Sequence, residues 1–381
     1  MRKFVVNPGP VEVSSRVLRA LGSPTMYHYD PEFKEIFRET QENIREIFQT
    51  DYDVVIMQGE ALLPLEAAAA GIVRPGVKCL NLVSGFFGEG YKGFLTKYGG
   101  EVVEVTTEYN DVVNSKEVEK VLEREGDVKV VSMLHCETPS GTINRIEEIC
   151  PIAKDHGAIT IVDAVSSFGG MELLPDEWGI DICIAGSQKC LASSPGLGMV
   201  SVSPDAWEAL EKVENPLRGS YMSLLDWKDV WLSGDRFPYT PSVNEIYALR
   251  VASAMVLEEG LEKVFKRYKR VGRASRAGIK AMGMEIYQKD EATASDTVTV
   301  VKAPHGISST EVTTRCLEKY GVSISGGMGV QSEELLRLGH MGPTAQLSVL
   351  LMSLAVLGKS LKDLGCKVEV GYGIDQAISA Y

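Results

Sequence analysis

The sequence predicts an α/β protein whose large domain has a mainly parallel sheet of seven strands, followed by a small C-terminal α+β domain. Short apolar runs rich in β-branched residues alternate with helical patterns through the first two thirds of the chain. The alternation has no fixed repeat length, which favours a wound sheet over a solenoid. The 381 residues are more than one core usually fills, and 44% of them are hydrophobic, which is enough to bury two cores.

The strands of the large sheet are expected at seven apolar runs: 53–57, 77–83, 101–105, 128–133, 158–162, 181–185 and 198–202. Apolar residues at helical spacing lie between them, at 34–49, 62–72, 116–123 and 146–156. Strands that alternate with helices usually pair in parallel, because each helix crosses back over the sheet. The pattern therefore predicts helices packed on a wound parallel sheet.

The strand signal stops between residues 242 and 283, where a long helical pattern is rich in Lys and Arg at 263–276. We expect this stretch to bridge the two domains. The division then places an N-terminal arm and the large domain at 1–255, and the small domain at 256–381. The run 297–302, a helix at 309–320, the segment 335–338 and a helix at 344–357 suggest the α+β character of the small domain.

Composition excludes several functional classes. The chain has 39 basic and 52 acidic side chains, and a net charge of −13 would repel nucleic acid and anionic membranes. Residues 1–13 contain too short an apolar run for a signal peptide, and the run 347–357 is too short to span a bilayer. Seven cysteines without a Cys-x-x-Cys pair indicate reduced thiols, so we expect a cytoplasmic protein.

Motifs for other chemistries fail on inspection. The tripeptide 358–360 (GKS) lacks the glycine that a phosphate-binding loop requires five positions earlier, where Ser353 stands. His135 and Glu137 begin like a zinc deaminase, but no Pro-Cys-x-x-Cys segment follows. The remaining histidines are scattered along the chain, so no metal site is expected.

Two polar residues follow apolar runs at the point where an open α/β sheet places its ligand crevice. Asp163 closes the run ITIVD, and Lys189 follows the next run among small residues. Taken singly, Asp163 could cap a loop and Lys189 could be a solvated surface charge. Taken together, 189 − 163 = 26 residues apart, they suit a pyridoxal-type cofactor. The lysine forms a Schiff base, and the carboxylate keeps the pyridine nitrogen protonated.

With these residues in place, the chain resembles class V aminotransferases of pyridoxal-phosphate (PLP) fold type I, in the branch of alanine-glyoxylate and serine-pyruvate aminotransferases. The resemblance covers nearly the whole chain and is carried by 7–10 (NPGP), 135–141 (HCETPSG), 162–167 (VDAVSS), 187–189 (SQK) and 337–342 (RLGHMG). It implies the PLP-dependent transferase fold and a transaminase that acts on an amino donor and a 2-oxo acid. It also implies a homodimer whose site is completed by the partner subunit.

The resemblance assigns roles around the cofactor ring. Lys189 resembles the lysine that forms the aldimine and shuttles the proton, and Asp163 resembles the partner of the pyridinium nitrogen. Val165 and Phe87 would pack on the two faces of the ring, although Phe87 could instead belong to the hydrophobic core. Thr138 would lie near the ring oxygen.

Other residues are implied around the substrate. Arg337 would hold the substrate carboxylate by a two-pronged hydrogen bond, unless it is a surface arginine. Tyr29 stands where many class V members carry arginine. Tyr239 and Thr240 fall in a segment that, in this family, reaches the site from the partner subunit.

The segment 58–62 (QGEAL) corresponds to the cup that cradles the cofactor phosphate, formed here by Glu60, Ala61 and Leu62. A glutamate in the cup would repel a phosphate, although Glu60 could instead be a first-turn helix residue turned to solvent. The longer segment 58–65 (QGEALLPL) resembles the pyridoxamine-pyruvate aminotransferase branch, as do 27–31, 237–243 and 340–346. That branch uses unphosphorylated vitamin B6 as a substrate.

We therefore expect an aminotransferase that moves an amino group between pyridoxamine and pyruvate, giving pyridoxal and alanine through an aldimine on Lys189. The alternative is a PLP-dependent alanine-glyoxylate, serine-pyruvate or aminophosphonate-pyruvate transaminase. One departure leaves the substrate open, because Met328 (337 − 9 = 328) stands where the pyridoxamine branch carries a second arginine. A catalytically silent protein on the same fold is disfavoured by the joint presence of Lys189, Asp163 and Arg337.

Overall fold

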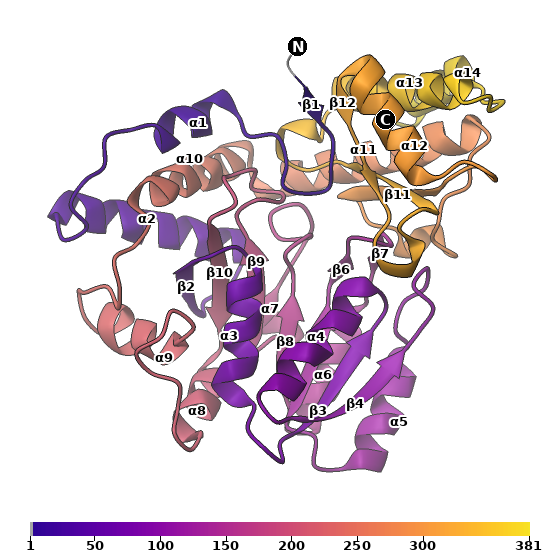
Figure 1. Ribbon diagram of the computed structural model, residues 1–381. Helices are drawn as coiled ribbons and strands as arrows, with labels where there is room; N and C mark the ends of the chain where they lie inside the picture. Colours follow the sequence, from indigo (N-terminus) through magenta and orange to yellow (C-terminus); the bar gives the residue numbers. More distant parts are fainter. Residues whose placement is uncertain (1–2) are drawn as a thin grey trace.

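The computed structural model describes residues 3–381, which form a large α/β unit and a smaller C-terminal unit (Figure 1). The large sheet consists of β2 (Asp53–Gln58), β3 (Lys78–Val83), β4 (Glu101–Thr106), β5 (Val130–Leu134), β8 (Ile159–Asp163), β9 (Ile182–Gly186) and β10 (Leu197–Val202). Each begins and ends within two residues of a run expected from the sequence. The predicted mainly parallel sheet of seven strands is therefore confirmed.

The strand order is β2-β10-β9-β8-β5-β3-β4, in which β10 is antiparallel to both of its neighbours and the other pairs are parallel. The central strands β5, β9 and β10 are buried along their whole length. Such burial requires cover on both faces of the sheet, which explains why these strands are continuous apolar runs without alternation.

Helices and short elements surround the sheet. They are α1 (Ser15–Leu21), α2 (Pro31–Phe48), α3 (Leu62–Ile72), α4 (Phe86–Lys97), α5 (Ser115–Glu125), the hairpin β6 (Cys136–Glu137) and β7 (Thr142–Ile143), α6 (Ile146–Asp155), α7 (Pro175–Trp178), α8 (Pro204–Lys212), α9 (Leu224–Trp227) and the π-helical turn Lys228–Leu232. In the view of Figure 1, α3 and α4 lie in front of the sheet. Helix α2 begins earlier than expected because Asp30 caps it, accepting the N–H of Glu32, and Pro31 fits the first helical position.

The long helical stretch after residue 242 is two helices, α10 (Val243–Glu259) and α11 (Leu261–Ala281). Gly260 separates them with a φ of +86°, a backbone conformation that favours glycine. The C-terminal unit then contains β11 (Val298–Lys302), α12 (Ser309–Tyr320), β12 (Val322–Ser323), β13 (Ser325–Gly326), β14 (Leu335–Gly339), α13 (Leu347–Asp363) and α14 (Val370–Ala380), with 3-10 turns at Glu291–Thr293, Gly329–Gln331 and Gly342–Thr344. Strands β11, β14 and β13 form an antiparallel sheet.

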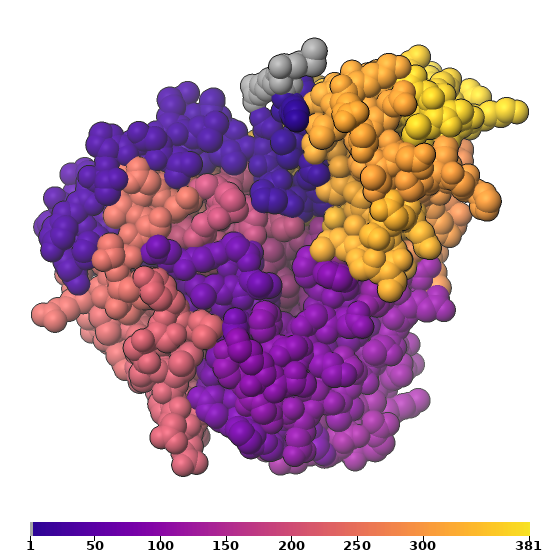
Figure 2. Space-filling model, viewed as in Figure 1, coloured from indigo at the N-terminus to yellow at the C-terminus, as the bar shows by residue number. Residues whose placement is uncertain are grey.

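The N-terminal segment connects the two units. Strand β1 (Phe4–Val5) pairs with β12, and Val6 packs into the core of the C-terminal unit. In Figure 2 the N-terminal residues, in indigo, lie against the orange C-terminal part of the chain. The division at 255/256 stays a prediction. Across residues 3–381, no helix combines the length and apolar character needed to cross a membrane.

Candidate active site

Lys189 and Asp163 lie at the same edge of the large sheet. Asp163 is the last residue of β8 and pairs with Ile184 of β9, and Lys189 lies in the loop that follows β9. The Lys189 ammonium donates a hydrogen bond to the carbonyl oxygen of Pro8, with Nζ 2.6 Å from the oxygen. A Cβ on Gly9 would lie 2.5 Å from Nζ, so the glycine leaves the space that the lysine occupies. The N-terminal segment therefore forms one wall around the lysine.

The charges of Lys189 and Asp163 are coupled through a buried environment. Burial raises the pKa of Asp163 to about 6, although the N–H of Val165, 2.9 Å from Oδ1, and the charge of Lys189 both favour the carboxylate. Burial also lowers the pKa of Lys189, and the positive charge of Arg337 lowers it further. A lysine whose pKa is lowered exposes its nucleophilic amine at lower pH.

Arg337 approaches the same site from the C-terminal unit. It lies in the middle of β14, opposite Val300 of β11 and Ser325 of β13. Its Nε donates to the carbonyl oxygen of Gly326 at 2.6 Å, and burial lowers its pKa to about 10. Within residues 3–381 its two terminal nitrogens make no hydrogen bond or ion pair, so the guanidinium is positioned yet free to hold a carboxylate.

Three residues expected around the ring are Thr138 and Val165, on loops, and Phe87, at the start of α4. The hydroxyl of Thr138 is hydrogen-bonded to that of Ser166, and both residues are buried. Val165 is buried and follows Asp163 by two residues. Phe87 lies in the first turn of α4, half-buried, with its ring centroid 5.4 Å from that of Phe86. The half-buried ring is compatible with either the stacking role or the core role expected from the sequence.

Glu137 is a candidate residue that the sequence analysis did not select. Its side chain is completely buried, and its two oxygens accept the N–H groups of Phe87 and Gly88 at 3.1 and 3.0 Å. Burial raises its pKa to about 8, while the positive charge of Arg337 acts in the opposite direction. A Cβ on Gly85 would lie 2.2 Å from Glu137 Cγ, so the glycine before α4 is required here. The carboxyl thereby fixes the first turn of α4, which carries Phe87.

The cup residues lie where α3 begins. Glu60 Oε1 accepts the N–H of Leu62 at 3.1 Å, and Glu60 Oε2 accepts the side-chain amide of Gln188 at 3.2 Å. Gln188 directly precedes Lys189, so the carboxylate faces the lysine loop although the residue is also exposed to solvent. Ala61 is buried and Leu62 is exposed. These two hydrogen bonds indicate that the Glu60 side chain faces the site. They do not support the alternative in which it is turned to solvent.

The remaining expected residues are Tyr239, Thr240 and Tyr29, and within residues 3–381 none of them is hydrogen-bonded to Lys189. The Tyr239 hydroxyl accepts a hydrogen bond from Trp227 Nε1 at 3.2 Å and from the N–H of Gln58 at 3.4 Å, which places it beside the cup of its own chain. Thr240 is exposed. Tyr29 is exposed and lies 4.2 Å from the ring of His28. For the part of the chain described, Tyr29 makes no recorded contact with Lys189, Asp163 or Arg337.

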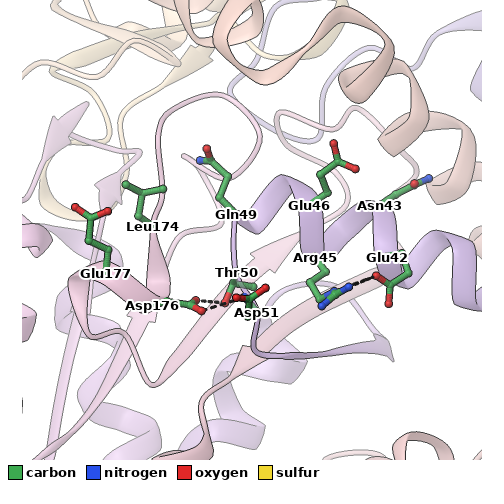
Figure 3. Close-up of a pocket in the computed structure, with 10 residues that line it drawn as sticks. All are labelled: Glu42, Asn43, Arg45, Glu46, Gln49, Thr50, Asp51, Leu174, Asp176 and Glu177. Atoms are coloured by element: carbon green, nitrogen blue, oxygen red, sulfur yellow. Dashed lines mark hydrogen bonds and ion pairs between the residues drawn. The ribbon is translucent and has the colours of Figure 1, made fainter.

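A separate hollow of about 590 Å³ lies between the end of α2 and α7 (Figure 3). It is lined mainly by acidic and polar residues, among them Glu46, Asp51, Asp176 and Glu177. None of the residues described above lines it, so it is not part of the Lys189 site. Among residues 3–381, no three His, Cys, Asp or Glu side chains are grouped as metal ligands would be.

Comparison with known proteins agrees with this geometry. The family model described as aminotransferase class-V matches residues 12–355. The chain is 39% identical to a pyridoxamine–pyruvate transaminase of Mesorhizobium japonicum, over 99% of this chain and 96% of that protein. The predictions of the family and of transaminase activity are thereby confirmed.

Solved structures agree with the fold. The crystal structure of pyridoxamine-pyruvate aminotransferase from Mesorhizobium loti has a TM-score of 0.97 at 37% identity, with coverage of 100% of this chain and 97% of that chain. The ureidoglycine-glyoxylate aminotransferase of Bacillus subtilis has a TM-score of 0.95 at 31% identity, with coverage of 100% and 98%.

Proposed function

The chain belongs to the class-V aminotransferase family, and from this premise we propose that it moves an amino group between pyridoxamine and pyruvate, giving pyridoxal and alanine. Similarity to proteins with this activity in two comparisons supports the proposal. The observation that carries it is the carboxylate of Glu60 at the start of α3, bonded to Leu62 and Gln188.

The residues present fit a vitamin B6 ring. Gly9 leaves room for the Lys189 side chain, whose amine would react with the ring aldehyde, and Asp163 would be the acidic partner of the pyridine nitrogen. When bound, the ring withdraws electrons from the carbon that is deprotonated during amino transfer. Lys189, Asp163, Thr138, Val165 and Phe87 would hold it.

Glu60 favours the unphosphorylated form of the ring. The first N–H groups of a helix are the usual ligands of a phosphate, but the N–H of Leu62 is already donated to the Glu60 carboxylate. A phosphate at the start of this helix would be repelled by the Glu60 carboxylate and would lack the Leu62 N–H as a hydrogen-bond donor. A hydroxymethyl group carries no charge and can donate a hydrogen bond to the carboxylate. The cup therefore matches pyridoxamine and pyridoxal better than their phosphate esters.

Arg337, Lys189 and Asp163 have separate roles in the reaction. Arg337 binds the carboxylate of pyruvate or alanine through its terminal nitrogens. Lys189, with its lowered pKa, takes and returns the proton at the reacting carbon. Asp163 keeps the pyridine nitrogen protonated, which requires its carboxyl to be ionised in the complex.

We further propose a cytoplasmic homodimer in which Tyr29 binds substrate and the segment that carries Tyr239 and Thr240 reaches the partner's site, with the Tyr239 hydroxyl held beside the cup of its own chain. Large side chains exposed at the start of α3 and just before α2, such as Leu62 and Tyr29, would be covered by a partner subunit. The free state of all seven cysteines within residues 3–381 supports a reducing compartment.

The second candidate is a PLP-dependent transaminase of the alanine-glyoxylate, serine-pyruvate or aminophosphonate-pyruvate type. It is favoured by Met328, which lies in the loop beyond the Gly326 carbonyl that holds Arg337 and brings no second positive charge. An activity assay of the purified protein distinguishes the two candidates. We expect it to convert pyridoxamine and pyruvate to pyridoxal and alanine, followed by absorbance and amino-acid analysis. Tightly bound phosphate ester, with turnover only when that ester is present, would establish the second candidate instead.

A further inference from the structure

Tyr268 is a buried tyrosine of α11 that has no part in the amino transfer proposed above. Its side chain has no exposed surface (0%). Burial raises the pKa of its hydroxyl well above the usual value, so the group stays protonated. A protonated phenol can donate one hydrogen bond and accept another.

The hydroxyl makes both kinds of bond, and each partner adjoins a residue of the site. It donates to the carbonyl oxygen of Cys190 at 3.3 Å, and Cys190 directly follows Lys189. It accepts the N–H of Gly342 at 2.7 Å, and Gly342 lies five residues after Arg337 (342 − 337 = 5), in the turn beyond β14. One oxygen atom thus joins the lysine loop to the segment that carries the arginine.

The Gly342 turn lies between the two cores, since Met341 and Ala345 pack in the core of the large unit and Leu336 and Leu338 of β14 pack in that of the C-terminal unit. Tyr268 packs in the core of the large unit, whereas Val271, one turn further along α11, packs in the core of the C-terminal unit. The segments also meet directly, since a Cβ on Gly342 would lie 2.3 Å from the Cβ of Ala192. Gly342 and Ala192 both have positive φ, +57° and +53°, so their backbones are held in a conformation that few residues adopt. The two backbones are in close contact at this point, and the Tyr268 hydroxyl is hydrogen-bonded to both.

We propose that Tyr268 is a positioning residue that sets the distance between Lys189 and Arg337. This inference rests on the proposed function in one respect, namely that Arg337 holds the substrate carboxylate while Lys189 acts at the amino-bearing carbon. The two groups must then lie a fixed distance apart on one small substrate. A displacement of about 1 Å at such a pair can lower the rate by roughly a hundred-fold. Because Tyr268 is completely buried, it would act only through the two backbone segments.

The test is the substitution Tyr268→Phe, which keeps the ring in its cavity and removes only the hydroxyl. We expect kcat/KM for pyruvate to fall roughly ten- to a hundred-fold, with a raised KM, while the Kd for pyridoxal measured by absorbance changes little. The matched control is Tyr91→Phe. Tyr91 is 5% exposed, and its hydroxyl donates to the carbonyl oxygen of Leu65 in α3 at 3.1 Å and not to the lysine loop. Both variants should lose some thermal stability, and only Tyr268→Phe should lose activity toward the oxo acid.

Equal kinetics for Tyr268→Phe and Tyr91→Phe would overturn the proposal and leave Tyr268 a stability residue. If Tyr268→Phe does not fold, amide hydrogen exchange in the wild type tests whether the Tyr268 hydroxyl joins the two segments. Slow exchange of the Gly342 amide supports the bridge, and exchange as fast as that of the exposed Gly306 amide overturns it. A wild type that is inactive with pyridoxamine but active with another amino donor refutes the proposed function alone, and the Tyr268 comparison is then made with that donor.

Discussion

Replacing Glu60 with glutamine tests the charge on which the choice of vitamin B6 form depends. Glu60→Gln keeps an oxygen that can accept the Leu62 N–H and removes only the negative charge. A phosphate in contact with the Glu60 carboxylate would bring two negative charges to about 4 Å from each other. Two unit charges at this separation repel by about 1 kcal/mol in water and about 4 kcal/mol at an effective dielectric of 20. Because Glu60 is exposed in the single chain, the effect lies between these limits. The variant should therefore gain affinity for the phosphate ester, relative to the free alcohol, by roughly five-fold to several hundred-fold.

Binding titrations of pyridoxal and its phosphate ester to the wild type and the variant measure this change directly. The gain should shrink as salt is added if solvent reaches the cup, and persist if a partner subunit closes it. Glu66→Gln is the matched control, since it changes net charge equally but lies further along α3, paired with Lys97. The reasoning is refuted if the wild type binds the ester tightly and Glu60→Gln leaves the ratio of the two affinities unchanged.

Three further substitutions test the other site residues. Lys189→Ala should lower turnover by at least roughly two to four decades in a steady-state assay, because the proton shuttle is lost; near-normal turnover would remove Lys189 from the chemistry. Asp163→Asn should lower turnover and, in the ligand-free protein, remove a fall in the free energy of unfolding between about pH 4 and 6. Because the pKa of Asp163 is raised to about 6, its contribution to the free energy of unfolding is fully present at low pH and is lost as pH rises through 6. Urea midpoints that change with pH equally in wild type and variant across this range would contradict the assignment. Arg337→Lys keeps the charge but not the planar fork, so KM for pyruvate should rise while pyridoxal still binds; an unchanged KM would assign the carboxylate to another residue.

The large sheet and its two reactive residues follow from short-range signals in the sequence. Strands β5, β9 and β10 are continuous apolar runs because both faces of the sheet are covered, and such runs are recognisable without any partner. Asp163 and Lys189 were identified by their position after neighbouring runs, since parallel strands end at a common edge. The expectation that these two residues lie together depends only on that rule.

Helix α4 and Glu137 could not be predicted in the same way. Helix α4 contains glycines at positions 88, 90 and 93, which disfavour a helix when the segment is considered alone. Its first turn is held by the Glu137 carboxyl, which lies 49 and 50 residues away from Gly88 and Phe87. Burial of a carboxyl is a property of the folded chain, so composition gives no sign of it. The glycine at position 85, next to an aromatic pair, was the one local signal of a close approach.

The charges assembled around Lys189 also bear on the substrate. Lys189 and Arg337 are the basic groups of the site, and each interacts with a buried carboxyl, Asp163 or Glu137, whose pKa is raised. When the ring is bound, its protonated pyridine nitrogen would pair with the Asp163 carboxylate. Arg337 is then the cation available to a substrate carboxylate. Met328 adds no second cation beside it. A 2-oxo acid with one carboxylate and a small uncharged side chain satisfies this balance, whereas a second carboxylate would be buried without a partner. Pyruvate meets that requirement, and the same charge balance disfavours dicarboxylic oxo acids whichever form of vitamin B6 is bound.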